Sequence, residues 1–266
     1  MWGEVTPAER LRSVTRRNLD DDTLAAAAAD ALAGFADEPA SLVVACRRVL
    51  AHHRAHGALW WVCSRILAAA DPAAAAHLAV RELEADRTGD RLGATLPLLD
   101  EGEVVAVVGY TSTIDDALLE RFDIDAVAVR VDGDDPVAAL RRRRSDHAVR
   151  VVDAWDPVLE RTSRLLVSAT AIGPERALVP LGTDEVLQEI GTDTRREVWL
   201  VGGVGRVLPA RVYDMVAASL PDDALFEEIS VQRFDRLAGP RGLERPSDAT
   251  ARIDSPVVPE LLRPLN

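Results

Sequence analysis

Apolar residues recur at helical spacing through the first part of the chain, up to about residue 99. Alanine fills many of these positions, and several stretches open with an acidic residue or with proline, as helices commonly do. The predicted helices cover residues 23–34, 38–53, 58–70 and 71–84. No run of β-branched residues interrupts this part, so the pattern predicts a bundle of helices.

A different pattern begins at Glu101. Val104 to Val108 is a short, continuous run of mostly β-branched residues, which is typical of a strand buried on both faces of a parallel sheet. Similar runs predict strands at residues 126–131, 149–152, 165–168 and 198–201, with helices at 114–121, 136–144, 157–161 and 184–190, and another after Val207. This alternation indicates right-handed βαβ crossovers. The expected fold class is α/β, with a Rossmann-like domain built on a mostly parallel, doubly wound sheet.

These patterns divide the chain into three parts. We expect a helical N-terminal domain over residues 1–100 and the Rossmann-like domain over residues 101–238. Residues 239–266 are rich in proline, glycine and arginine, a composition that favours an extended C-terminal tail.

Charge and composition narrow the choice of partners. The chain carries 31 basic and 44 acidic residues, a formal net charge of −13, which repels a nucleic-acid backbone. Every basic residue is arginine, so mechanisms that need a Schiff-base lysine or a phosphate-gripping lysine are excluded. No apolar run is long enough to cross a bilayer, and the first residues lack the apolar core of a secretory signal. We therefore expect a cytoplasmic protein without membrane or nucleic-acid partners.

Cysteine and histidine do not form a recognisable metal site. Cys46 and Cys63 lie in separate helical stretches, and a disulfide framework is not indicated. His52, His53 and His56 have no spacing that matches a compact zinc ligand set. We expect neither a metal nor another cofactor.

Candidate chemistry follows three of the predicted strands, because ligands bind at the carboxyl ends of strands in an open α/β sheet. Backbone amides, hydroxyl groups and one guanidinium occur there, and together they suit a phosphate. The candidate ligand-binding residues are Gly109, Tyr110, Thr111, Ser112 and Thr113 in the first loop, Thr170, Gly182 and Thr183 in the second, and Gly202, Gly203, Gly205 and Arg206 in the third.

Each group also has a structural interpretation. Ser112 or Thr113 in the first loop, and Thr183 in the second, are suitable N-caps for the helices that follow them. An acidic cluster after the second strand either meets ribose-like hydroxyls or forms a solvated turn. It consists of Asp132, Asp134 and Asp135.

The three loops taken together resemble one family in order and spacing. The matching stretches are VVGYTSTIDDALL at 107–119, LLVSATAI with LVPLGTDEVL at 165–172 and 178–187, and VWLVGGVGRVLP with FEEISVQRFDRLAGPRG at 198–209 and 226–242. They resemble the translation initiation factor 2B regulatory subunits, ribose-1,5-bisphosphate isomerase and methylthioribose-1-phosphate isomerase. The resemblance implies a helical N-terminal domain, a Rossmann-like C-terminal domain and a dimer built through the latter.

The departures from this family point away from its reaction. In the isomerases the resemblance implies a cysteine in the first loop and an aspartate in the second as general acid and base. Thr111 and Thr170 stand at the matching positions. A threonine hydroxyl titrates far above neutral pH, so neither residue replaces a thiol or a carboxylate. Val179-Pro180 lies near the place of the phosphate-binding Asn-Lys pair, whereas Arg206 falls where relatives often have lysine.

We therefore expect a catalytically degenerate member, with no catalytic residue assigned. It would bind a phosphorylated small molecule, a sugar phosphate or a nucleotide, in a regulatory or assembly role, as a homodimer or with a related subunit. One alternative is a sugar phosphate aldose-ketose isomerase that takes its acid and base from Asp115, Asp116 or Asp153. Another is a structural partner subunit with Trp60-Trp61 at its interface.

Overall fold

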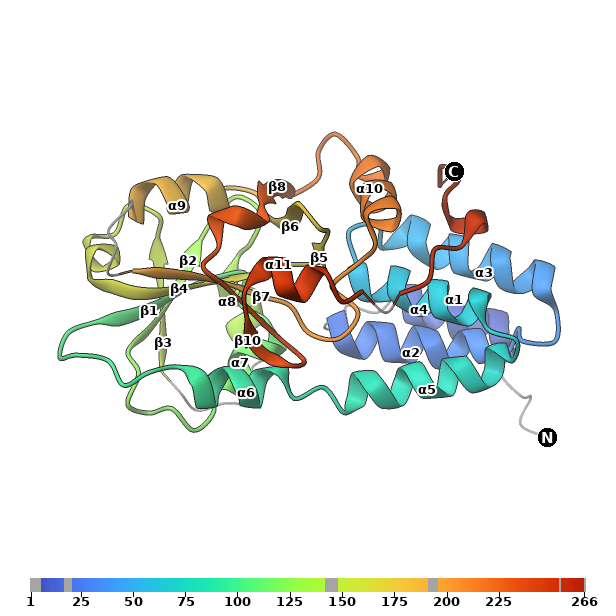
Figure 1. Ribbon diagram of the computed structural model, residues 1–266, viewed down its shortest axis with the longest axis horizontal. Helices are drawn as coiled ribbons and strands as arrows, with labels where there is room; N and C mark the ends of the chain where they lie inside the picture. The colour runs from blue at the N-terminus through green and yellow to red at the C-terminus, as the bar shows by residue number, and fades with distance from the viewer. Residues whose placement is uncertain (1–5, 17–20, 142–147, 191–195, 254, 266) are drawn as a thin grey trace. The chain divides into compact units, whose positions relative to one another are not determined.

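A computed structural model describes residues 6–16, 21–141, 148–190, 196–253 and 255–265 (Figure 1). The chain forms two compact units, each built from segments that are far apart in sequence. The first unit consists of Met1–Asp86, Val204–Pro221 and Ile253–Asn266, and the second of Arg87–Gly203 and Asp222–Arg252. The sequence-based division at residues 100 and 238 assumed contiguous segments and does not include these returns of the chain.

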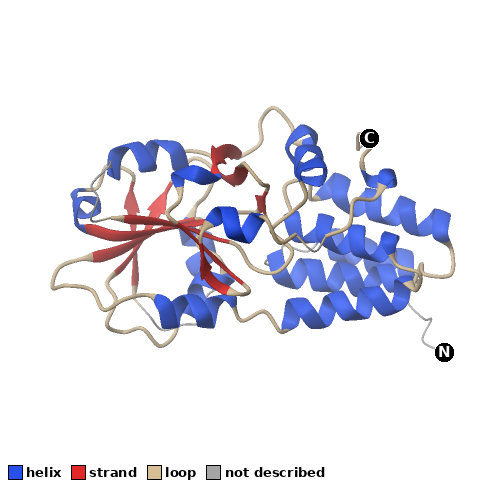
Figure 2. Ribbon diagram, in the orientation of Figure 1, coloured by secondary structure: helices blue, strands red, loops and turns tan. Residues whose placement is uncertain are grey.

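The first unit is helical, in agreement with the pattern of its sequence (Figure 2). Its helices are α1 (Pro7–Arg16), α2 (Asp21–Ala33), α3 (Pro39–His52), α4 (Gly57–Ala68), α5 (Pro72–Glu84) and α10 (Ala210–Ser219), with the 3₁₀ turn η3 (Pro259–Leu261). Prolines open α3 and α5, and the Asp71 carboxylate accepts the Ala74 amide at 2.9 Å. Helix α4 is almost wholly apolar, and Trp60 and Trp61 are fully buried in it.

One arginine holds the last segment of this unit. The Arg47 guanidinium of α3 donates to the carbonyls of Glu260 at 3.0 Å, Arg263 at 3.2 Å and Pro264 at 2.5 Å. A charged donor that serves three carbonyls keeps an irregular segment in one place without strand pairing. Part of the predicted extended tail is therefore attached to the helical unit.

The second unit is built on a seven-stranded sheet in the order β10-β9-β7-β4-β1-β2-β3. Its strands are β1 (Val104–Val108), β2 (Ala126–Arg130), β3 (Val149–Asp153), β4 (Thr162–Ser168), β7 (Glu197–Val201), β9 (Arg236–Gly239) and β10 (Gly242–Glu244). All neighbouring pairs are parallel except β9 and β10. The predicted fold class, α/β with a mostly parallel doubly wound sheet, is confirmed.

Helices cover both faces of this sheet. Figure 1 shows α9 (Thr183–Ile190) on the opposite side from α6 (Thr88–Thr95) and α7 (Ser112–Leu118). Leu92, Ile114 and Leu118 pack with Val105 and Val107 in one buried core. The helix predicted over residues 136–144 is present as α8 (Pro136–Leu140), and residues 142–147 lie outside the described residues. Within the described residues, no helix has the length and apolar character that a membrane span needs.

A second sheet, antiparallel and with three strands in the order β5-β6-β8, was not predicted. It consists of β5 (Ala171–Ile172), β6 (Arg176–Pro180) and β8 (Phe226–Ser230). Two-residue β5 is too short for a periodic signal, and β6 ends in proline, which argues against a strand. The predicted tail likewise contains β10 and the short helix α11 (Pro246–Thr250), because its glycine and proline residues form turns rather than an extended chain.

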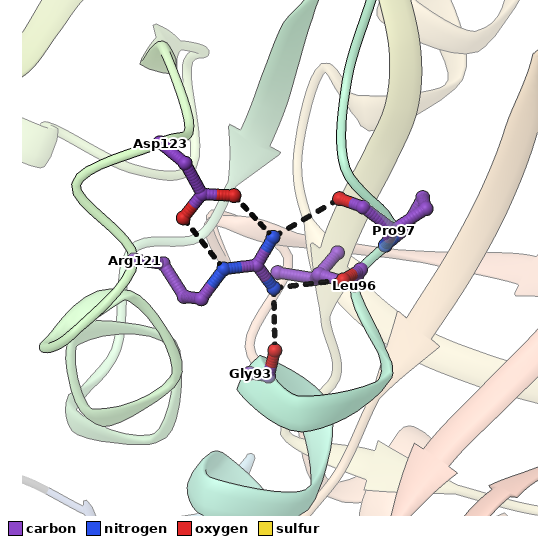
Figure 3. A network of polar contacts seen from close by, with 5 residues as sticks. All are labelled: Gly93, Leu96, Pro97, Arg121 and Asp123. Carbon is purple, nitrogen blue, oxygen red and sulfur yellow. Dashed lines mark hydrogen bonds and ion pairs between the residues drawn. The ribbon is translucent and has the colours of Figure 1, made fainter.

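A second arginine joins two loops of the second unit (Figure 3). The Arg121 guanidinium donates to the Asp123 carboxylate, twice at 2.8 Å, and to the carbonyls of Gly93 at 2.6 Å, Leu96 at 2.7 Å and Pro97 at 3.0 Å. Its side chain is only 18% exposed, so these carbonyls have little access to water as a substitute. Asp123 raises the pKa of Arg121, and the charge is therefore permanent.

Replacing this arginine should destabilise the protein. In Arg121→Ala three carbonyls lose a charged donor, and we expect the free energy of unfolding to fall by about 2–3 kcal/mol in urea titrations. Arg121→Lys should recover little of it, because an ammonium group cannot place five donors in one plane. Arg150→Ala is the control, since Arg150 and Asp125 form an exposed pair, and its effect should stay within about 0.5 kcal/mol. Equal effects of the two alanine variants would contradict this role.

Candidate functional site

The strand order places a topological switch point between β1 and β4. From β1 the chain continues to β2 and β3 on one side, and β4 then pairs with β1 on the other side. Loops that leave β1 and β4 at this point diverge to opposite faces of the sheet, which is where open α/β sheets bind ligands. The loops at residues 109–113 and 169–170 both begin here.

Two hydroxyl groups meet at the switch point. Thr111 Oγ1 lies 3.3 Å from Ser168 Oγ, at the carboxyl end of β4. Thr111 is also the N-cap of α7, but its side chain does not bond to the helix amides. The prediction that Ser112 or Thr113 is the N-cap of this helix is therefore wrong. Ser168 is not among the predicted residues, although a hydroxyl ending a buried strand at the switch point is a usable signal.

Gly109 allows the two loops to approach this closely. Its φ of +75° is a conformation that side chains strongly disfavour, and a Cβ at this position would lie 3.0 Å from Ser168 Cβ and 3.2 Å from Pro180 Cγ. The loop after β1 therefore packs against the ends of both β4 and β6.

Tyr110 turns into the core instead of lining the site. Its side chain is 5% exposed, and its hydroxyl donates to the Asp115 carboxylate at 3.0 Å. This hydrogen bond also occupies Asp115, one of the carboxylates considered as an alternative acid or base. The group that Tyr110 presents at the strand tips is its backbone N–H.

Asp134 receives that N–H, with Oδ2 at 3.3 Å from the Tyr110 nitrogen. Burial raises the pKa of the Asp134 carboxyl above its ordinary value of 3.8, and the charge of Asp135 acts in the same direction, while bonds from the Tyr110 and Gly109 amides oppose them. Asp135 caps α8 by accepting the Val137 amide at 3.1 Å, and Asp132 is exposed. A carboxylate of the protein thus lies against the first loop, where a ligand anion was expected.

The second loop is held by groups of the protein as well. Thr170 donates both its amide, at 3.0 Å, and its hydroxyl, at 3.4 Å, to the Leu178 carbonyl. Thr183 is fully buried and its hydroxyl donates to the Pro180 carbonyl. The next amide, that of Asp184, donates to Glu227 Oε1 at 2.9 Å. Gly182 and Thr183 therefore set the backbone conformation at the start of α9. The Glu227 carboxylate occupies the position at this helix start where a ligand anion would bind.

The third loop is divided between the two units. Gly202 and Gly203 are buried in the second unit, and the Gly202 amide donates to the Ala238 carbonyl at 3.0 Å. Gly205 and Arg206 belong to the first unit. Gly205 has a φ of +77°, and a Cβ there would lie 3.1 Å from atoms of the Trp61 ring. Arg206 is 6% exposed, and its role as a ligand-binding residue stays a prediction.

Comparison with solved structures gives the fold a name. A Pyrococcus horikoshii OT3 translation initiation factor eIF-2B matches with a TM-score of 0.71 at 15% identity, over 92% of this chain and 98% of that one. A chain of the tetrameric eIF2B-beta2-delta2 complex from C. thermophilum matches at 0.65 and 15%, over 92% and 93%. The eIF2B beta protein from Chaetomium thermophilum matches at 0.64 and 14%, over 90% and 88%. This chain has the initiation factor 2B fold.

No protein-family model and no curated protein sequence match the chain. At 12–15% identity, the likeness to the solved structures is one of fold. The resemblance seen in the sequence is confirmed at this level, and what the initiation factor 2B fold does in this chain depends on its own residues.

The chemistry at the strand tips of this initiation factor 2B fold is that of hydroxyls and one carboxyl. Cys46 and Cys63 are both buried in helices of the first unit, so neither thiol belongs to the residues of the switch point. Asp153 forms an ion pair with Arg130 at 3.0 Å, and Asp116 is exposed on α7. Within the described residues, no three histidine, cysteine or acidic side chains are grouped to hold a metal.

The raised pKa of Asp134 gives a stability test. A folded pKa above the unfolded one makes the free energy of unfolding fall as pH rises through the interval between the two values. Asp134→Asn removes this loss, since an amide oxygen can still accept the Tyr110 N–H. We expect the variant to gain stability relative to the parent protein as pH increases from about 4 to neutral, measured by urea unfolding across that range.

Asp132→Asn is the matched control, because Asp132 is an exposed carboxylate of the same turn. It should follow the parent protein at every pH. If Asp134→Asn were less stable than the parent at neutral pH, the carboxylate would be a net stabiliser of the loop and the assignment of burial as the dominant effect would be wrong.

Proposed function

We propose that this chain is a catalytically degenerate initiation factor 2B-like protein that binds a phosphorylated small molecule at the carboxyl ends of β1 and β4. The observation that carries the proposal is the pair of hydroxyls, Thr111 Oγ1 and Ser168 Oγ, 3.3 Å apart at the switch point. Its role is regulatory or in assembly, in the cytoplasm.

The groups at this point suit binding better than proton transfer. The two hydroxyls share a hydrogen bond with each other, and the Thr170 hydroxyl donates to the Leu178 carbonyl. A threonine or serine without a base is a poor acid and a poor nucleophile near neutral pH. As hydrogen-bonding groups, however, both accept and donate, which is what the hydroxyls of a sugar require.

Charge decides which end of the ligand lies at the hydroxyl pair. Asp134 accepts the amide that would otherwise face a phosphate, and its carboxylate repels an anion at close range. The same carboxylate is a good acceptor for ribose-like hydroxyls. We therefore assign the hydroxyl groups of the ligand's sugar to Thr111, Ser168 and Asp134.

Assembly is proposed from the relatives in fold. One of them is a chain of a tetrameric complex of beta and delta subunits. We propose that this chain pairs with a second copy or with a related subunit. A purely structural subunit is the alternative, and it would form such a complex with an empty ligand site.

Ligand binding is tested by thermal unfolding and calorimetry with ribose 5-phosphate and nucleoside monophosphates. We expect at least one of them to raise the melting temperature in a concentration-dependent way, because a ligand that binds only the folded state stabilises it. The double variant Thr111→Val with Ser168→Ala should bind about tenfold or more weakly, a loss of about 1.4 kcal/mol or more.

Thr95→Val is the control for the double variant. Thr95 is exposed on α6 and donates to its own helix at the Arg91 carbonyl, so its loss should leave the affinity unchanged. Absence of stabilisation by every probe would refute ligand binding. If the protein then still formed a complex of two chains, the structural subunit would be the better description.

A second candidate function rests on Asp134, which accepts the amide of Tyr110, the residue before Thr111. A carboxyl with a raised pKa in such a place is a group that could exchange protons. In that case the protein would be a sugar phosphate aldose-ketose isomerase with altered acid and base. We expect no exchange of the proton next to the sugar carbonyl in deuterated water, followed by NMR with ribose 5-phosphate. Exchange that is lost in Asp134→Asn would overturn the assignment as a non-catalytic binder.

A further inference from the structure

A separate groove lies wholly within the first unit. It has a volume of about 360 Å³ and runs between α1, the turn after α2, and α3. Small-molecule sites commonly have volumes of roughly 300–1,000 Å³. None of the residues that line the groove belongs to the candidate loops after β1, β4 and β7.

The floor of the groove is apolar. Leu11 and Ala45 are each 4% exposed and close it from below, and Phe35 lines it from the turn after α2. Val44 of α3 also lines the groove and is 65% exposed. Burying such a side chain under an aliphatic ligand is favourable, because apolar surface leaves water.

Two arginines line the same groove, Arg12 from α1 and Arg48 from α3. Arg48 follows Val44 by four residues, so the cation and the apolar side chain lie on one face of the helix. Both arginines are exposed. Positive charge over an apolar floor is unusual in a chain of net charge −13, and it favours an anion with an aliphatic part.

The carboxylates beside the groove have donors of their own. Glu9 accepts the amide and the hydroxyl of Thr6, both at 2.9 Å, which lowers its pKa ahead of the smaller effect of Arg12. Glu38 accepts the Ser41 hydroxyl at 2.8 Å. Both carboxylates therefore bind groups at helix starts, and neither is among the residues that line the groove.

We propose that this groove binds an amphiphilic carboxylate, a fatty acid of short to medium chain length. Its aliphatic chain lies over Val44, Leu11 and Phe35, and its carboxylate meets the guanidinium groups of Arg48 and Arg12. The groove is thus a second ligand site, chemically different from the polar site at the strand tips.

Calorimetry on the full chain with hexanoate, octanoate and decanoate tests this assignment. Each added methylene that is buried should strengthen binding by up to about fourfold, so the affinity should rise along the series. Decylamine should bind about tenfold or more weakly than decanoate, because its charge is repelled by the arginines. Added salt should weaken decanoate binding.

Variants locate the site. Arg48→Glu and Val44→Glu should each weaken decanoate binding about tenfold or more, and both positions are exposed, so the fold should tolerate them. Arg81→Glu is the control, since it reverses an exposed arginine on α5 outside the groove and should leave binding unchanged. Thermal unfolding of each variant checks that it is folded.

Three results would overturn the proposal: no binding of decanoate, equal binding of decylamine, or binding that neither groove variant weakens. If decanoate does not bind but Val44→Glu changes the molecular mass in light scattering, the groove is covered by a second copy of the chain instead. None of these outcomes depends on Thr111 or Ser168, so the result is independent of the ligand site in the second unit.

Discussion

The pairing of β1 with β4 is the constraint on which the second unit depends. All five residues of β1, Val104 to Val108, are buried, and the strand has parallel neighbours on both sides. Both faces of such a strand must be buried, so its position at the centre of the sheet is strongly specified. Because the chain reverses its direction of winding at this pair, the same packing that stabilises the sheet also sets the point where the loops after β1 and β4 diverge.

Much of this arrangement follows from periodicity alone. The continuous apolar runs predicted the five strands of the large sheet that lie between residues 104 and 201, and the prolines at residues 39 and 72 predicted two helix starts. The small antiparallel sheet was not predicted, because its strands are short and one ends in proline. Leu178 and Glu228 pair across two strands although they are far apart in sequence. Pairing of this kind produces no local sequence pattern from which the strands could be predicted.

The contacts within the candidate site were not predicted from the sequence. The rule that ligands bind after the strands selected the loop of Thr111 as a candidate, and the family resemblance selected Thr170 as its counterpart. The roles of Tyr110, Thr183 and Asp134 depend on tertiary neighbours: a buried carboxylate, a nearby carbonyl and a distant amide. Two positions expected to attract a ligand anion are instead occupied by carboxylates of the chain, Asp134 and Glu227. An acidic protein has such groups in excess, and they can satisfy loop and helix-start amides internally.

The interleaved composition of the two units bears on how the protein is made. Four times along its length the polypeptide passes from one unit to the other, and the segment from Ile253 onward, which Arg47 holds, is synthesised after the other two segments of the first unit. The helices before Asp86 must therefore wait for this segment while the sheet of the second unit assembles. Ribosome-bound intermediates would expose the surface of α3 that this segment contacts, and the order of synthesis makes early truncation products candidates for chaperone binding.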